Sequence, residues 1–155
     1  MPTLFAALST IPNACQALPN VVTGGQPGAM HFEAAKAAGC EVVLDLRDPM
    51  EPRPLDEPAT VRTLGMEYIN VPVTPDTLTD ETLDRIREIL RRNDGRPMLC
   101  HCGSGSRVGG AMIAHLMLDQ DFAQEDAVNQ AMRLGLRNPE LIDWAIGYVV
   151  RVRRA

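Results

Sequence analysis

The stretch MLCHCGSGSRVGG, residues 98–110, predicts a strand, a tight loop and a helix in direct succession. An apolar run ends at Cys102, the small residues GSGS follow at 103–106, and Arg107 opens the helix. A loop of such small residues can turn successive backbone N–H groups inward as a nest for an anion, and a helix N-terminus favours negative charge at the same place. A cysteine there is expected to ionise to the nucleophilic thiolate at neutral pH. The stretch therefore predicts an anion-binding site that carries a reactive thiol.

The rest of the chain alternates short apolar runs with helical stretches, which is typical of βαβ units around a mostly parallel sheet. Strands are expected at 20–23, on the sheet edge, and at 41–46, 66–73 and 97–101; helices are expected at 29–38, 59–64, 107–118, 124–134 and 139–150, with a further helix between Thr79 and the turn at 93–95. Segment 47–58 holds four prolines and is expected to be an exposed loop. The sequence predicts a single α/β domain over residues 1–155, with a central sheet flanked by helices.

Composition limits the partners of the chain. It has 155 residues, is 45% hydrophobic, and carries a formal net charge of −5. This length supports one compact core, and the acidic balance argues against nucleic acid or a membrane surface as the main partner. Residues 1–20 contain no Lys or Arg and are interrupted by Pro12, so we predict neither a secretory signal nor a spanning helix, and we expect a cytoplasmic protein. The sequence leaves the oligomeric state open.

Four cysteines, Cys15, Cys40, Cys100 and Cys102, match no disulfide scaffold of small secreted proteins and are expected to be reduced. A metal site could be read into Cys100, His101 and Cys102. Successive side chains of a strand face opposite ways, however, so these three cannot all bind one ion. The sequence also has no second pair of ligands elsewhere. We therefore predict no metal and no cofactor. His101 is expected to point away from the anion site and to adjust the hydrogen bonds of the loop.

The string HCGSGSRVGG at 101–110 resembles the signature of cysteine-dependent phosphatases, in which a strand-end His-Cys precedes a small-residue loop, an arginine and a helix. The resemblance extends over residues 18–150. The order TGGQPG, EVVLDLR, GMEYINVPV and MLCHCGSGSR is similar to the bacterial phosphatase-like family related to dual-specificity phosphatases, which is also found attached to β-lactamase-like hydrolases. This resemblance implies a phosphatase-type α/β fold, a phosphocysteine intermediate without metal, and a phosphorylated protein or small molecule as substrate.

The resemblance also implies a role for each residue of the motif. Cys102 would attack phosphorus, and Arg107 would bind two oxygens at once through its planar guanidinium. The other contacts to the phosphoryl oxygens would come from the amides of Gly103, Ser104, Gly105, Ser106 and Arg107. The related phosphatases protonate the leaving group with an aspartate on a loop that precedes the cysteine, and Asp76 is the candidate here. Asp80 competes, but its place in the first helical turn after Thr79 already explains it.

The spacing of the motif departs from the phosphatase signature, because four residues separate Cys102 from Arg107 where that signature has five. A loop of this length is similar to the cysteine loop of rhodaneses. In that chemistry Cys102 would carry a persulfide, and the partner would be a sulfur donor such as thiosulfate. A non-catalytic module that binds phosphorylated or sulfated ligands is a third possibility. The sequence thus favours phosphomonoester hydrolysis, with sulfur transfer as the alternative.

Overall fold

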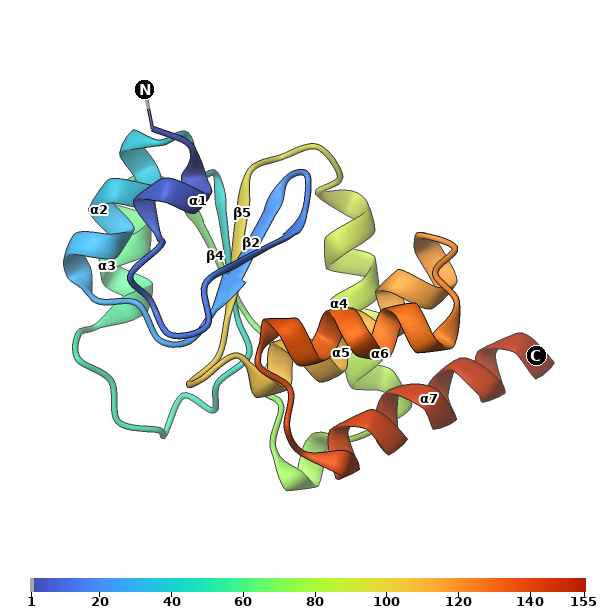
Figure 1. Ribbon diagram of the computed structural model, residues 1–155. Helices are drawn as coiled ribbons and strands as arrows, with labels where there is room; N and C mark the ends of the chain where they lie inside the picture. Colours follow the sequence, from blue (N-terminus) through green and yellow to red (C-terminus); the bar gives the residue numbers. More distant parts are fainter. Residues whose placement is uncertain (1) are drawn as a thin grey trace.

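The structure, a computed structural model, describes residues 2–155 and has a five-stranded sheet at its centre (Figure 1). The strand order is β1-β2-β5-β3-β4, and the bounds are Cys15–Leu18 (β1), Val21–Gly24 (β2), Val42–Asp45 (β3), Glu67–Asn70 (β4) and Met98–His101 (β5). β1 and β2 pair antiparallel, whereas all other neighbouring strands are parallel. The predicted α/β fold with a mostly parallel sheet is confirmed. β5 is the central strand, so the residues that follow it lie in the middle of the sheet, at the carboxyl ends of the parallel strands.

The edge of the sheet differs from the prediction. The strand expected there, at 20–23, is β2, and it lies second in the sheet because β1 covers it. β1 has the sequence CQAL and lacks the β-branched and aromatic residues that signal a strand, which is why the pattern does not reveal it. Its pairing with β2 is irregular between Gln16 and Leu18. The hairpin therefore depends on tertiary contacts more than on local preference.

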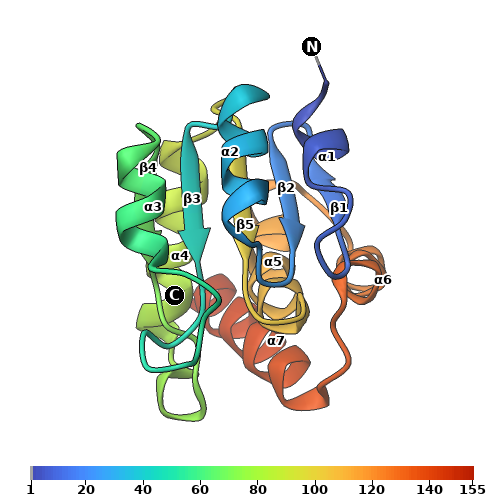
Figure 2. The same cartoon turned by 90° about the vertical axis from the view of Figure 1, so that its left-hand side faces the viewer.

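Helices cover both faces of the sheet (Figure 2). α1, α2 and α3 pack on one face, and α4 to α7 pack on the other. The bounds are Leu4–Ala7 (α1), Ala29–Ala37 (α2), Glu57–Thr63 (α3), Asp80–Arg92 (α4), Ser106–Asp119 (α5), Gln124–Leu134 (α6) and Pro139–Arg154 (α7). Within the described part of the chain, no helix combines the length and the apolar character needed to cross a bilayer.

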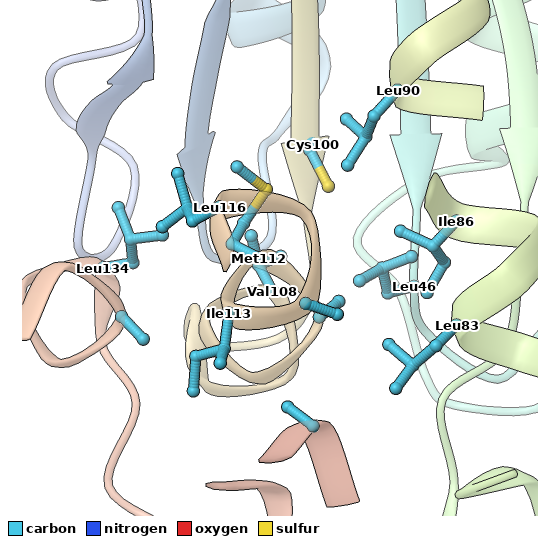
Figure 3. Packing of buried hydrophobic residues seen from close by; sticks show 14 of the residues in the cluster. Leu46, Leu83, Ile86, Leu90, Cys100, Val108, Met112, Ile113, Leu116 and Leu134 are labelled. Carbon is cyan, nitrogen blue, oxygen red and sulfur yellow. The ribbon is translucent and has the colours of Figure 1, made fainter. Parts of the chain in front are cut away.

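The larger core lies between the sheet and helices α4 and α5 (Figure 3). Ile86 of α4 and Met112 of α5 are fully covered there, together with Leu46, which directly follows β3. α5 can approach its neighbours closely because Gly109 has no side chain: a Cβ at that position would lie 2.8 Å from the Cβ of Leu136. This close packing holds the first turns of α5 against the end of α6.

Segment 47–58 is an exposed loop only in part. Met50 at its tip is 88% exposed, as expected, but Arg47 is only 9% exposed and Glu57 is fully buried. α3 also begins at Glu57, two positions before the predicted start at residue 59. Charged side chains become buried where other charged or polar groups pair with them. The segment therefore contributes polar contacts to the interior that its composition does not reveal.

Candidate active site

Cys102 lies directly after β5, at the start of the predicted loop. Its thiol is 1% exposed, and the backbone N–H of Gly105 donates a hydrogen bond to Sγ over 3.1 Å. Gly105 has φ +104° and forms the N-cap of α5, so the chain turns sharply from the loop into the helix. The N-terminus of α5, which carries a positive partial charge, thus lies next to Sγ of Cys102, as the sequence predicts.

The carbonyl groups of the loop point away from the sulfur. The backbone N–H of Gln26 donates to the carbonyl of Gly103 over 3.0 Å, and the side-chain amide of Asn13 donates to the carbonyl of Ser104 over 2.6 Å. In a trans peptide the N–H of the next residue points opposite to the carbonyl, so the N–H groups of Ser104 and Gly105 face the other way. Asn13 and Gln26 therefore hold the nest open from outside, a role the sequence analysis missed.

Arg107 is held in place by Glu51. Its two terminal nitrogens donate to the two carboxylate oxygens of Glu51 over 2.7 and 3.0 Å. The Glu51 carboxylate also accepts from Nε of Arg47 over 3.2 Å and from the backbone N–H of Asp48 over 2.7 Å. The hydrogen bond from Arg107, more than any other contact, lowers the pKa of Glu51 to about 2. Both terminal nitrogens of Arg107 are thus paired with an ionised Glu51, so the expected contact of Arg107 with two anion oxygens requires the anion to replace part of this pairing.

A cavity of about 540 Å³ opens beside the loop. It is lined by Asp48, Glu51, Val73, Thr74, Pro75, Leu78, Ser106, Arg107, Asn138, Glu140 and Leu141. The lining comes mainly from segments that follow β3, β4 and β5, at the carboxyl ends of parallel strands, where ligands of α/β sheets bind. Asp48 and Glu51 line the cavity, although the sequence predicted only that they belong to a loop. Both follow the carboxyl end of β3, and this position is the signal by which sequence reasoning could have found them.

The two candidate acids, Asp76 and Asp80, have different surroundings in the structure. Asp76 lies in the short 3-10 helix Pro75–Thr77, and the flanking residues Thr74 and Leu78 line the cavity, but Asp76 itself is exposed and outside the lining. Asp80 binds Arg151 over 2.7 Å, and this hydrogen bond lowers its pKa. Asp80 lies in the first turn of α4, as expected, and it also has a structural partner in α7 that the sequence did not indicate.

Two of the other three cysteines, Cys40 and Cys100, carry thiols that ionise less readily than a free thiol. Residues 2–155 include all four, and the structure has each of them as a free thiol. Burial raises the pKa of the Cys40 thiol to about 11, and burial also raises the pKa of Cys100. Cys15 is half-buried on the edge strand β1. Cys102 is the thiol that accepts the N–H of Gly105, the N-cap of α5.

A buried polar cluster lies behind the loop, on the other face of β5. His101 points into it, away from the cavity, as predicted, and its Nε2 lies 2.6 Å from Oε2 of Glu57. Arg53 binds both Asp45 and Glu57. Asp45, Glu57 and His101 are close enough together to hold a metal ion, but the guanidinium of Arg53 already contacts both carboxylates. We therefore treat the cluster as an ion-pair network.

The mostly parallel sheet, the cysteine at the end of its central strand and the arginine at the start of the next helix form the arrangement that is typical of the cysteine-dependent phosphatase class. Residues 13–141 match the family model described as "DSP-PTPase phosphatase fused to NAD+ Kinase", and the chain belongs to this family of phosphatase-like enzymes. The predicted resemblance to dual-specificity and tyrosine phosphatases is confirmed.

Several individual proteins are similar to this chain. The beta-lactamase hydrolase-like protein of Agrobacterium fabrum is 24% identical over 106 residues, which is 66% of this chain but only 24% of that relative's length. A DUF442 protein from Shewanella putrefaciens CN-32 is 22% identical, with a TM-score of 0.78 over 94% of this chain and 96% of its own. P. aeruginosa TpbA, solved in complex with pTyr, is 14% identical in sequence. Its TM-score is 0.70, and the match covers 92% of this chain and 91% of TpbA. The likeness to these solved structures shows the shared fold.

Proposed function

We propose that the protein hydrolyses phosphate monoesters through a phosphocysteine on Cys102. The observation that carries this proposal is the geometry of the loop at the end of β5: the N–H of Gly105 donates to Sγ of Cys102 over 3.1 Å, and the guanidinium of Arg107 lies against the loop, 3.2 Å from where a Cβ of Gly103 would be. Backbone donors and a planar guanidinium aimed at one place stabilise the charge of a transferring phosphoryl group. The family assignment supports the same reaction class.

The reaction has two steps. The thiolate of Cys102 forms an S–P bond while the P–O bond to the leaving group breaks, and Asp76 gives its proton to the leaving oxygen. Water then attacks the phosphocysteine, the S–P bond breaks with its electrons returning to sulfur, and the carboxylate of Asp76 takes the proton from water. Inorganic phosphate leaves, and both side chains regain their starting state.

The acid is proposed on the position of its loop. Asp76 would act after a small movement of the segment between Thr74 and Leu78, because both flanking residues already line the cavity. Asp48 is the competing aspartate because it lines the cavity directly, although its Oδ1 accepts the N–H of Met50 over 2.9 Å. Asp76→Asn should slow hydrolysis of an alkyl phosphate far more than that of an aryl phosphate with an acidic leaving group, whereas Asp48→Asn should not discriminate between them. Discrimination by Asp48→Asn alone would transfer the role to Asp48.

Sulfur transfer is the alternative that the Cys102-to-Arg107 spacing favours. The test compares p-nitrophenyl phosphate and thiosulfate with cyanide as substrates of the purified protein and of its Cys102→Ser variant. We expect phosphate release by the wild type, its loss in the variant, and little thiocyanate from either. Thiocyanate formation without phosphate release would assign the protein to sulfur transfer. Retained phosphate binding without turnover of either substrate would indicate a binding module.

A further inference from the structure

Two neighbouring cavities lie at the end of the sheet opposite to Cys102. One has a volume of about 360 Å³ and the other of about 180 Å³. They form one groove, because they share four lining residues: Leu90, Asp94, His115 and Gln120. Val21, the first residue of β2, also lines the groove, so the groove lies at the amino ends of the parallel strands, whereas Cys102 follows their carboxyl ends. The groove is therefore separate from the candidate active site.

His115 is a buried histidine that lines both cavities and has one unpaired ring nitrogen. Its side chain is only 3% exposed, and its Nδ1 lies 2.9 Å from Oδ2 of Asp119. Its Nε2 makes no hydrogen bond to any residue in the described range 2–155. Within that range, Nη2 of Arg53 is the one fully enclosed side-chain nitrogen or oxygen without a partner, so Nε2 of His115 is accessible from the groove. Because buried polar atoms normally have a partner, this nitrogen indicates a ligand.

The contact with Asp119 determines which ring nitrogen of His115 carries the proton. Arg87 donates two hydrogen bonds to the Asp119 carboxylate, over 2.8 and 3.0 Å. Burial alone would raise the pKa of Asp119, but these bonds and the contact with His115 keep that pKa below its usual range. Burial lowers the pKa of His115, so the ring is uncharged at neutral pH. Its one proton lies on Nδ1, which faces an ionised carboxylate, and Nε2 therefore presents a lone pair to the groove.

The charges around the groove favour a positively charged hydrogen-bond donor. The two nearby arginines, Arg87 and Arg91, both contact Asp119. Asp94, in contrast, forms no ion pair within the described part of the chain, so its carboxylate is open to a ligand. The last turn of α5 carries no basic residue, which leaves the negative partial charge of this helix end without a local cation. A cation that donates a proton fits both this charge and the lone pair of His115.

The lining and the size of the groove indicate an organic cation rather than a metal ion. A zinc site takes three or four protein ligands around one point. Among the described residues, the one group of three such side chains close enough for this is Asp45, Glu57 and His101, which lies outside the groove. A volume of about 360 Å³ is instead typical of small-molecule sites. The groove also has an apolar wall, which consists of Leu18, Pro19, Val21, Leu90 and Leu118.

We propose that this groove binds a small amphiphilic amine, whose protonated amino group donates a hydrogen bond to Nε2 of His115 and is attracted by Asp94, and whose apolar part contacts the apolar wall. Asp119 lines the groove and acts as a positioning residue, because it holds the ring in the form that accepts. No residue of the cysteine loop lines the groove, so this site does not depend on the proposed function.

The test follows Nε2 of His115 by nitrogen NMR of the ¹⁵N-histidine-labelled protein at neutral pH while 2-phenylethylamine is added. Phenylacetate and 2-phenylethanol are matched probes of the same size, the first with a negative charge and the second with none. We expect the amine to shift the Nε2 signal at millimolar concentrations, the alcohol to bind about tenfold more weakly, and phenylacetate to leave the signal unchanged. No shift with the amine, or an equal shift with phenylacetate, would overturn the proposal.

Three variants separate the contributions of the groove residues to the affinity for the amine, measured by isothermal titration calorimetry. His115→Phe keeps a planar ring but removes the acceptor, and it should weaken binding at least about tenfold. Asp94→Asn should weaken binding about threefold, as for an exposed ion pair. Glu88→Gln is the matched control, because Glu88 is an exposed carboxylate of α4 outside the groove lining, and it should leave the affinity unchanged. Equal losses in Asp94→Asn and Glu88→Gln would show a general effect of charge and would overturn the proposal. If His115→Phe does not fold, Asp94→Asn and the NMR titration of the wild type decide the matter.

Two further measurements separate this site from a metal site and from the active site. If Zn²⁺ shifts the Nε2 signal of His115 and the amine does not, the groove is a metal site and the proposal is wrong. Cys102→Ser should bind the amine as tightly as the wild type, and a loss of binding in that variant would contradict a separate site. Because these measurements need no turnover, the groove can be confirmed even in a protein that hydrolyses no phosphate ester.

Discussion

Gly105→Ala tests whether the geometry of the cysteine loop limits the reaction. Gly105 has φ +104°, and a Cβ there would lie 2.4 Å from the carbonyl oxygen of Leu134. Ordinary van der Waals contact begins at 3.4 Å, so the loop or the end of α6 must move by about 1 Å to accept a methyl group. That displacement carries the N–H that donates to Cys102 Sγ. A misplacement of about 1 Å costs roughly a hundredfold in rate, which is the loss of kcat/KM that we expect.

Gly95→Ala is the matched control for this variant. Gly95 also has a left-handed conformation, φ +80°, but nothing lies within 4 Å of its added Cβ. Both variants should lose about 1–2 kcal/mol of unfolding free energy from backbone strain, and Gly105→Ala should lose about 1–3 kcal/mol more from the clash. Urea unfolding and steady-state hydrolysis of an aryl phosphate measure the two effects. Equal stability losses, with wild-type kcat/KM in both variants, would refute the reasoning.

Two further predictions concern Glu51 and Thr79. The hydrogen bond with Arg107 lowers the pKa of Glu51 from 4.5 to about 2. Ionised Glu51 therefore stabilises the folded state fully above pH 4.5. This contribution to the unfolding free energy is lost as the pH falls through 2. Urea midpoints should therefore decrease more steeply over this range in the wild type than in Glu51→Gln; parallel curves would contradict the ion pair. Thr79 accepts the N–H of Thr82 at the start of α4, so Thr79→Ala should lower the unfolding free energy by about 1 kcal/mol without changing kcat, and a loss of activity would show that the cap also serves the site.

The parts of the fold that the sequence predicts are those whose signals are local. The strand, loop and helix around Cys102 follow from an apolar run, small residues and a helix start in immediate succession. Helix α4 begins after the predicted N-cap Thr79, whose side chain accepts a backbone N–H, and helix α6 has the predicted bounds 124–134. In each case the residues that decide the structure are within a few positions of one another.

The parts that sequence reasoning missed depend on partners far apart in the chain. Glu57 is buried because His101 lies against it, and nothing near Glu57 in the sequence indicates this contact. Glu51 belongs to the site because it binds Arg107 from another strand-end loop. Asn13 is 91 positions from the carbonyl that it binds in the cysteine loop. These contacts form only when the fold brings the ends of parallel strands together. The composition of segment 47–58 therefore predicts a charged, proline-rich loop but does not predict which residues that loop contacts.

The most direct test of the central claim is to trap the intermediate on the sulfur. The protein is mixed with an aryl phosphate, quenched in acid within milliseconds, digested, and examined by mass spectrometry under conditions that preserve the S–P bond. The account predicts one phosphoryl group on the peptide that contains Cys102, and none on that peptide from Cys102→Ser. A wild type that releases phosphate with every quenched sample unmodified at Cys102, or modified at another residue, would contradict it.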